Sequence, residues 1–336
     1  MSKLNFAIFG LGRMGSVHLN NIISNNNANI SFIFDTNKKK LNYFQKKYKL
    51  EVPKNINKDI FQNKNIDVVF ISSPTNTHLE LILKSIKYKK FIFCEKPIDL
   101  NLRKINKVRK LCESYKKTFQ IGFNRRFDPT VANVIKKSKN GTVGNIEKLI
   151  ITSRDRSPPP ANYIKSSGGI LRDCSIHDID LMLNIFEKDR IKEVFCYASN
   201  LFDKNAKKYK DYDTIVSIFK TTKGKIAIIN NSRHSSYGYD QRIEVFGNKG
   251  MLQTENIRHQ NVNEFTNNST SKSESYLNFF LERYSESFKI ELDVFLNSIK
   301  KNKSSKVSFK DCRNALIICE ALYNSIKNKK SVSISY

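Results

Sequence analysis

The stretch Phe6-Ala7-Ile8-Phe9-Gly10-Leu11-Gly12-Arg13-Met14-Gly15 indicates how the first third of this chain folds. Four apolar residues predict a buried strand, and the glycines after them have the GxGxxG spacing that joins a strand to a helix in dinucleotide-binding domains. Such glycines allow a tight turn and let the backbone approach a pyrophosphate that faces the helix N-terminus. The stretch therefore predicts a cofactor site made of Gly10, Leu11, Gly12, Arg13, Met14 and Gly15.

An acidic residue, Asp35, ends the second predicted strand. A carboxylate at this place accepts hydrogen bonds from the adenosine ribose hydroxyls of NAD, and it repels the additional phosphate of NADP. The sequence therefore favours NAD. The run Lys38-Lys39-Lys40, which could screen a phosphate, keeps NADP open, and a glycine turn without any ligand is the remaining alternative.

Residues 5–122 alternate short apolar segments with amphipathic ones, which predicts a parallel sheet with crossover helices. The predicted strands are Phe6–Phe9, Ile30–Phe34, Val68–Ile71, Phe91–Cys94 and Phe119–Ile121. The predicted helices are Met14–Ile23, Lys38–Tyr48, Thr77–Lys84 and Leu102–Ser114. Strands that are apolar throughout fit a doubly wound α/β fold covered by helices on both faces. We assign residues 1–122 to this Rossmann-type, NAD-binding domain.

The pattern changes after Gly122 to longer strands separated by turns, with few helices. The predicted strands are Leu149–Ser153, Glu193–Ser199, Thr214–Phe219, Lys225–Asn231 and Gln241–Phe246, with a hairpin turn at 221–224. Residues 255–275 are polar and predict a mobile loop, and Leu281–Ile299 and Cys312–Ile326 predict closing helices. Residues 123–336 thus predict an α+β domain on a mostly antiparallel sheet, which can leave one face for a partner subunit.

Two loops at predicted strand ends carry polar side chains, and such ends are where doubly wound sheets bind ligands. The loop Ser72-Ser73-Pro74-Thr75-Asn76-Thr77-His78 supplies the cofactor candidates Ser72, Pro74, Asn76 and His78. For His78, a surface position at the start of a helix is an equally good interpretation. The second loop, Glu95-Lys96-Pro97, places a lysine before a proline that can adopt a cis peptide bond. We interpret Glu95 and Lys96 as site residues, against the alternative of an ordinary surface lysine.

Asp173 and His177 lie four residues apart in a predicted helix, so they are expected to share one face. A carboxylate beside a histidine can fix its tautomer and stabilise the imidazolium that forms when it accepts a proton. A metal site is less well supported because no second histidine lies nearby and the cysteines do not cluster. A capping aspartate beside a buried histidine is the structural alternative.

The composition of the chain bears on nucleic-acid binding, membrane association and cellular location. The 336 residues carry a formal charge of +28, but the lysines are spread along the whole chain, so we expect no nucleic-acid partner. No apolar run approaches the roughly 20 residues needed to cross a bilayer, so no membrane association is expected. The six scattered cysteines suggest reduced thiols, and nothing resembles a signal peptide, so we expect a cytoplasmic protein.

Taken together, the motifs resemble those of the Gfo/Idh/MocA oxidoreductase family, over almost the whole chain. The resemblance is carried by Gly10–Gly15, Phe93-Cys94-Glu95-Lys96-Pro97, 122–128, Ser153-Arg154-Asp155 with Pro158-Pro159-Pro160, Ser167–Ile170, Asp173–Asp180 and 237–240. It implies an N-terminal Rossmann domain, a C-terminal α/β domain whose open sheet forms homo-oligomers, often tetramers, and catalytic roles for Lys96, Asp173 and His177. The substrate-binding residues that it implies are Lys96, Asn124, Arg125, Asp155, Asp173, His177 and Tyr237.

Within this family the inositol dehydrogenases match best, which implies a cyclitol substrate, NAD as cofactor and oxidation of myo-inositol at C2. Another inositol isomer or a sugar is the first alternative, and a catalytically silent, NAD-bound sugar sensor is the second. The chain departs from its relatives at Arg156, where proline is common, and it has no tryptophan. Arg156 leaves the exact substrate open.

Overall fold

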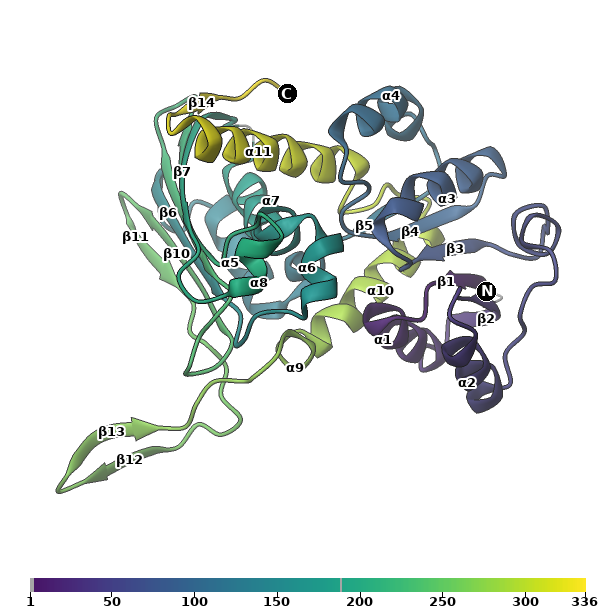
Figure 1. Ribbon diagram of the computed structural model, residues 1–336, viewed down its shortest axis with the longest axis horizontal. Coiled ribbons are helices and arrows are strands. Elements are labelled where there is room, and N and C mark those ends of the chain that lie inside the picture. The colour runs from purple at the N-terminus through teal and green to yellow at the C-terminus, as the bar shows by residue number, and fades with distance from the viewer. Residues whose placement is uncertain (1–2, 188) are drawn as a thin grey trace. The chain divides into compact units, whose positions relative to one another are not determined.

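The computed structural model describes residues 3–187 and 189–336 and forms two compact units (Figure 1). The first unit comprises Met1–Asn124 and Ser287–Arg313, and the second comprises Arg125–Glu286 and Asn314–Tyr336. The sequence predicts a single boundary after residue 122. The structure differs because the later segment 287–313 returns to the first unit, where its apolar side chains join the core.

The first unit is built on a parallel sheet with the strand order β2-β1-β3-β4-β5. Its strands are β1 (Leu4–Phe9), β2 (Ala28–Phe34), β3 (Val68–Ile71), β4 (Phe91–Glu95) and β5 (Phe119–Gly122). A parallel bridge between Phe32 and Glu51 continues the sheet beyond β2. Each strand coincides with a predicted one to within two residues, and the doubly wound Rossmann fold is confirmed.

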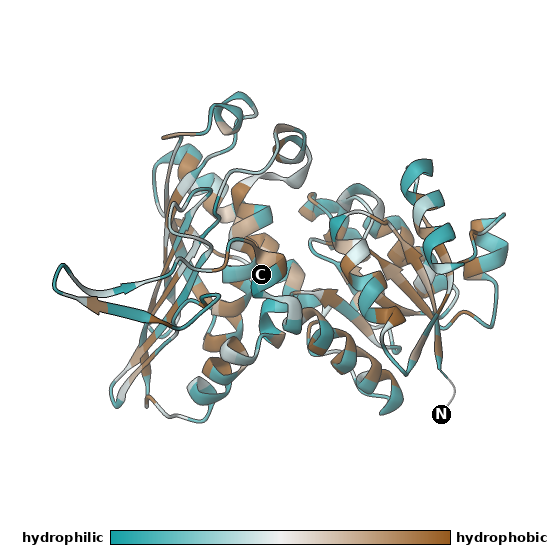
Figure 2. Ribbon diagram, turned by 90° about the horizontal axis from the view of Figure 1, so that it is seen from below, coloured by the Kyte–Doolittle hydropathy of each residue, from teal (hydrophilic) through white to brown (hydrophobic). Residues whose placement is uncertain are grey.

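Helices cover the sheet of the first unit. They are α1 (Arg13–Ile23), α2 (Lys38–Tyr48), α3 (Thr75–Lys87), α4 (Leu102–Glu113) and α10 (Ser285–Lys300), with a π-helical turn at Asn57–Phe61. Leu19 of α1, Leu41 of α2 and Phe295 of α10 belong to one buried cluster with the strand residues Phe70 and Phe93. Figure 2 shows the strands of this unit as hydrophobic, between helices whose outer sides are hydrophilic.

The second unit contains a seven-stranded sheet in the order β11-β10-β6-β9-β8-β7-β14. The strands are β6 (Ile146–Arg154), β7 (Ile191–Ser199), β8 (Thr214–Thr221), β9 (Ile226–Ser232), β10 (Asp240–Gly247), β11 (Gly250–Gln253) and β14 (Val332–Ser333). Only the pairing of β6 with β9 is parallel among these strands. The predicted mostly antiparallel sheet is confirmed, as is the turn between β8 and β9, where Gly224 has a φ of +85°.

Helices of the second unit lie on one side of this sheet (Figure 1). They are α5 (Pro129–Lys139), α6 (Ala161–Ser167), α7 (Ile176–Phe186), α8 (Lys204–Lys208) and the last part of α11 (Phe309–Asn328), with α9 (Phe280–Arg283) following the sheet and short helical turns at Asn124–Phe127 and Leu171–Ser175. The sequence predicts few helices here and misses α5, α6 and α8. Two of these are short, and α5 is rich in lysine, so the apolar periodicity that marks a helix is weak.

Residues 255–275, predicted as a mobile loop, contain a β-hairpin of β12 (Asn263–Thr266) and β13 (Ser269–Ser273). In Figure 1 this hairpin projects from the sheet of the second unit. The prediction is wrong here because every residue of β12 is exposed. A strand that buries neither face has no alternation of polar and apolar residues by which the sequence could reveal it.

Candidate active site

The glycine loop of the first unit joins β1 to α1 as the sequence predicts. Gly10 has a φ of +93°, and a Cβ there would lie 2.5 Å from the Ser72 carbonyl oxygen and from the Ser73 nitrogen. A Cβ at Gly15 would overlap the Gly10 carbonyl. These two glycines are therefore required by the packing of the protein itself.

Gly12 differs from its two neighbours. A Cβ built on it would meet no atom within 4 Å, and its φ of −68° suits any residue. Gly12 is also the N-cap of α1, and in the described part of the chain no side chain caps this helix. The open side of Gly12 and the uncapped N–H groups together fit the pyrophosphate of a dinucleotide.

Asp35 lies beside the same loop, at the end of β2. Its two carboxylate oxygens accept hydrogen bonds from the backbone N–H groups of Leu11 and Asn37, both at 2.7 Å. Each oxygen has a second lone pair, so the half-buried carboxylate can still accept ribose hydroxyls. Arg13 and Met14 follow in the first turn of α1. These residues fit a dinucleotide with an unphosphorylated ribose.

The Ser72–His78 loop is tied to the glycine loop and to the Lys96 loop. Ser72 Oγ donates to the Gly10 carbonyl at 2.9 Å, while Pro74 and Asn76 are exposed. His78 is 1% exposed, and its ring nitrogens lie 2.8 Å from the Pro97 carbonyl and 2.7 Å from the Ser73 carbonyl. The interpretation of His78 as a surface residue is wrong, because its ring is buried between the two loops.

The Glu95-Lys96-Pro97 segment ends β4, and its Lys96–Pro97 bond is cis, as predicted. The Glu95 carboxylate contacts His18, whose Nε2 lies 2.7 Å from its Oε1. The same carboxylate lies within 3.0 Å of where a Cβ of Gly122 would stand. Glu95 is therefore a support of this segment, and Lys96 is the half-buried residue that it positions.

Asp173 and His177 of the second unit do not lie on one regular α-helix. Asp173 belongs to a π-helical turn at Leu171–Ser175, and His177 to the first turn of α7. The i,i+4 geometry predicted from the sequence is therefore wrong in detail, because a π turn is wider than an α turn. Both side chains are partly exposed, as residues that meet a ligand must be.

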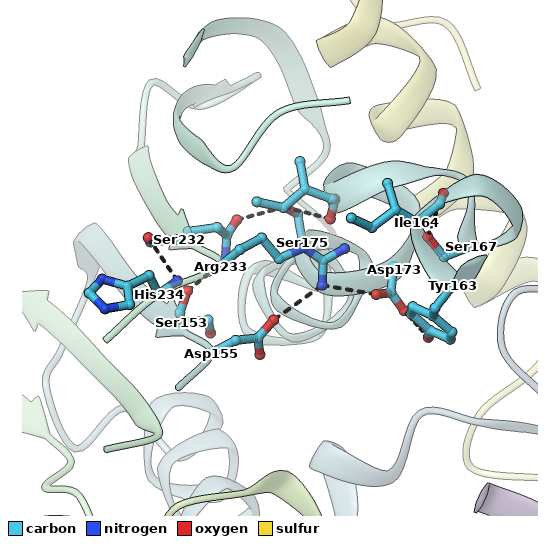
Figure 3. Close-up of polar contacts among 12 residues, drawn as sticks. Ser153, Asp155, Tyr163, Ile164, Ser167, Asp173, Ser175, Ser232, Arg233 and His234 are labelled. Carbon is cyan, nitrogen blue, oxygen red and sulfur yellow. Dashed lines mark hydrogen bonds and ion pairs between the residues drawn. The ribbon is translucent and has the colours of Figure 1, made fainter. Parts of the chain in front are cut away.

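The Asp173 carboxylate is bound by two side chains that the spacing did not reveal. Tyr163 Oη donates to its Oδ1 at 2.7 Å, and Arg233 Nη1 donates to its Oδ2 at 3.0 Å. The same Nη1 donates to Asp155 Oδ2 at 3.1 Å (Figure 3). We call Asp155, Asp173, Tyr163 and Arg233 the acid–arginine cluster. Its members come from segments distant in sequence, so no local sequence motif predicts the cluster.

Asp155 is the member of the acid–arginine cluster with a carboxylate oxygen to spare. Its side chain is 26% exposed, and within the described residues its Oδ1 takes part in no hydrogen bond. Burial raises the pKa of this carboxyl, the Arg233 guanidinium counteracts the rise, and the Asp173 carboxylate adds to it. Oδ1 is therefore suited to accept a hydrogen bond from a hydroxyl group.

Arg125, predicted to contact the substrate, is buried and is engaged by side chains of the protein. It is 5% exposed, and its Nη1 lies 2.5 Å from Asp178 Oδ1, an oxygen that also accepts from Ser153 Oγ at 2.7 Å. Asn231 Nδ2 donates to the other Asp178 oxygen at 2.8 Å. This network fixes α7 on β6 and β9, directly beneath the turn that carries His177.

The two remaining substrate candidates have different surroundings. Asn124 is 6% exposed, its carbonyl accepts from Ser287 Oγ at 2.7 Å, and its side-chain Nδ2 donates to the same hydroxyl at 3.3 Å. Tyr237 is 40% exposed, and its hydroxyl donates to Asp240 Oδ2 at 2.8 Å. The Tyr237 ring can therefore meet a ligand while Asp240 holds its hydroxyl in place.

Residues 3–187 and 189–336 hold no group of three or more His, Cys, Asp or Glu side chains arranged to bind a metal ion. In the same ranges, none of the helices combines the length and apolar character needed to cross a membrane.

Comparison with known proteins assigns both parts of the chain. A family model described as the Gfo/Idh/MocA oxidoreductase family with an NAD-binding Rossmann fold matches residues 4–123, and the Gfo/Idh/MocA C-terminal domain model matches residues 131–253. The chain is 38% identical over 334 residues to the myo-inositol 2-dehydrogenase of Thermotoga maritima, with 98% of each chain covered.

Two solved structures are similar over nearly their whole length. One is a myo-inositol dehydrogenase from Corynebacterium glutamicum, with 36% identity, a TM-score of 0.93 and 99% of each chain covered. The other is the scyllo-inositol dehydrogenase of Lactobacillus casei with bound NAD(H) and scyllo-inositol, with 27% identity, a TM-score of 0.90 and 99% of each chain covered.

Proposed function

The chain belongs to the Gfo/Idh/MocA family of oxidoreductases and its cofactor is NAD, and we propose that it oxidises myo-inositol at C2 to the 2-keto compound. The observation that carries the proposal is the acid–arginine cluster, which offers carboxylate oxygens to the hydroxyl groups of a polyol. Relatives named as myo-inositol dehydrogenases share the whole length of the chain. We assign cofactor binding to residues 1–122 and substrate binding to residues 123–336.

The reaction divides between a proton and a hydride. NAD would be held by the glycine loop and Asp35, and when bound it would supply the acceptor for the hydride of the substrate carbon. His177 is the general base that takes the hydroxyl proton, and Lys96 donates a hydrogen bond to the same oxygen and stabilises its developing negative charge. Asp173 orients His177 and favours the imidazolium that forms. Tyr163 and Arg233 in turn hold the Asp173 carboxylate in one orientation.

A cyclitol suits the groups that surround the proposed reaction. Each ring hydroxyl needs a donor and an acceptor, and leaving a buried one unpaired costs about 1–3 kcal/mol. Asp155 Oδ1 supplies a hydrogen-bond acceptor in addition to the reacting groups, and Tyr237 supplies an exposed aromatic ring. We therefore propose that Asp155 accepts a hydrogen bond from a substrate hydroxyl and that the Tyr237 ring contacts the substrate.

The isomer is the part of the proposal with a specific competitor. The Lactobacillus casei relative is named for scyllo-inositol, so oxidation of that isomer by this chain is the second candidate function. We would measure NADH formation with NAD or NADP against myo-, scyllo- and chiro-inositol and glucose. The proposal predicts the highest kcat/KM for myo-inositol with NAD, and a higher value for another isomer would contradict it.

The role of Lys96 is tested by Lys96→Ala. We expect turnover to fall by at least the factor of about 10² that a positioned acid–base group contributes, while NAD affinity is retained. A variant that instead loses NAD affinity and keeps turnover at saturating NAD would make Lys96 a cofactor residue only. Binding is measured by calorimetry.

We also propose that the chain forms a homo-oligomer, a tetramer by resemblance to its family. The side of the second unit's sheet that its helices leave uncovered exposes large apolar residues, among them Tyr197 at 71% and Met251 at 50%. Apolar patches of this kind are uncommon on monomers and are typical of subunit interfaces. The molar mass in solution, measured by light scattering, tests this proposal.

A further inference from the structure

Arg233 is the member of the acid–arginine cluster that binds both acids, whereas the proposed reaction uses only its contact with Asp173. It directly follows β9, and its side chain is 4% exposed. Its backbone N–H donates to the Asp213 carbonyl at 2.8 Å, and the preceding carbonyl, of Ser232, accepts from Asp155 N at 2.9 Å. The guanidinium therefore extends from a backbone that is fixed on both sides.

A single nitrogen of Arg233 binds both acids. Nη1 lies 3.1 Å from Asp155 Oδ2 and 3.0 Å from Asp173 Oδ2, while Nη2 is buried and makes no hydrogen bond within the described residues. In Figure 3 the two carboxylates lie on either side of the guanidinium. Two carboxylates that share one donor are close enough to disfavour each other's ionisation unless a cation compensates.

The other groups around the pair do not replace this cation. Asp211, which precedes β8, adds a third carboxyl near Arg233, and both its oxygens accept from the Ile170 N–H. Burial raises the pKa of the Cys174 thiol, which therefore remains neutral. Arg125 is engaged by Asp178.

We propose that Arg233 is a positioning residue that keeps Asp155 and Asp173 ionised together and aimed as a pair, so that one accepts a substrate hydroxyl while the other orients His177. This inference rests on the proposed oxidation of an inositol. It explains why two acids from different segments can act side by side. It also predicts that a cation at residue 233, rather than the guanidinium shape, is what the site requires, because one nitrogen makes both contacts.

The test compares Arg233→Met, Arg233→Lys and the control Arg283→Met. Arg283 is as buried as Arg233, with side chains 5% and 4% exposed, and it forms an ion pair with the buried Asp128 in the same unit, so its loss has a structural cost at least as large. The readout is the pH profile of kcat and of kcat/KM for the inositol that the wild type oxidises. Should Arg233→Met fail to fold, Arg233→Gln replaces it.

Loss of the cation raises the pKa of the Asp155 and Asp173 carboxyls. As the pH is lowered, both carboxylates are therefore protonated earlier, and activity falls at a higher pH than in the wild type. Removing an opposite charge at this distance is expected to move the acidic limb upward by about 1–3 pH units in Arg233→Met. Arg233→Lys should return most of that shift, and Arg283→Met should show none. An unmoved limb in Arg233→Met, or an equal shift in Arg283→Met, would overturn the proposal.

A second measurement separates this inference from the proposed function. Titration of aspartate carboxyl carbons by NMR, with Asp155→Asn and Asp173→Asn to assign the signals, follows both acids without substrate. We expect both to titrate at higher pH in Arg233→Met than in the wild type. This measurement needs no substrate, so a positive result would support the charge coupling even if the protein oxidised no inositol and the proposed function failed. Unchanged titrations of both acids would refute the coupling.

Discussion

The glycine loop of the first unit and the acid–arginine cluster of the second unit are built by opposite means. The loop has few side chains, and it relies on backbone N–H groups, on Gly10 and Gly15 where a Cβ would collide, and on Gly12 where nothing lies nearby. The cluster consists of charged side chains gathered from distant segments. The loop should therefore be sensitive to added volume, and the cluster to altered charge or protonation.

Removal of the proposed base should have the largest effect on turnover, and it should lower kcat without changing cofactor binding. We expect His177→Ala to lower kcat by about 10²–10⁴ and to leave NAD affinity unchanged, because the dinucleotide residues belong to the first unit. The matched control is His234→Ala, which removes an exposed histidine of the same unit. Near-normal turnover in His177→Ala would remove the general-base assignment.

Two alanine substitutions in the glycine loop should separate protein packing from ligand binding. Gly15→Ala forces a Cβ against the Gly10 carbonyl and should destabilise the protein by about 1–3 kcal/mol, as overpacking does. Gly12→Ala meets no protein atom, so its melting temperature should match or slightly exceed that of the wild type while NAD affinity falls at least about tenfold. Melting curves with and without NAD measure both effects. Equal NAD affinity in Gly12→Ala and wild type would show that the backbone at Gly12 does not approach the cofactor.

These two regions also differ in how far the sequence could predict them. The glycine loop, Asp35 and the strands of the first unit follow from short-range patterns, because a buried parallel strand is apolar throughout and its turn is one contiguous motif. The sequence predicts helix α2 and the strand Val68–Ile71 with the bounds that the structure has. Here local sequence and local structure coincide.

The acid–arginine cluster had no such signal. The pairing of β6 with β9 brings Asp155 beside Arg233, and Asp173 lies in a π turn. No rule based on residue spacing predicts either feature. For the same reason Arg125 and His78 were predicted as ligand contacts although the fold buries them. Polar residues at strand ends signal a site, but tertiary pairing decides which of them face the ligand and which support it.

The two acids of the cluster should separate binding from turnover. Asp155→Asn keeps the size of the side chain and removes the charge, so we expect KM for the inositol to rise about tenfold, the cost of weakening one hydrogen bond to a charged group, with a small change in kcat. Asp173→Asn should instead lower kcat, because Asp173 acts through His177. Steady-state kinetics at saturating NAD measure both. Equal effects of the two variants on kcat would contradict this division of roles.

The smallest effect on catalysis is expected from the exposed sheet face of the second unit. Tyr197→Glu places a charge on an apolar surface that we propose is buried between subunits, and a buried unpaired charge is costly, so the oligomer should dissociate. The control Leu111→Glu alters an apolar residue of the first unit that is 49% exposed, and it should leave the molar mass unchanged. Both units of each chain keep their own cores, so kcat per chain in Tyr197→Glu should stay within about twofold of the wild type if each subunit holds a complete site. A monomer that has lost turnover would instead show that the neighbouring copy supports the acid–arginine cluster, and an unchanged molar mass would place the interface elsewhere.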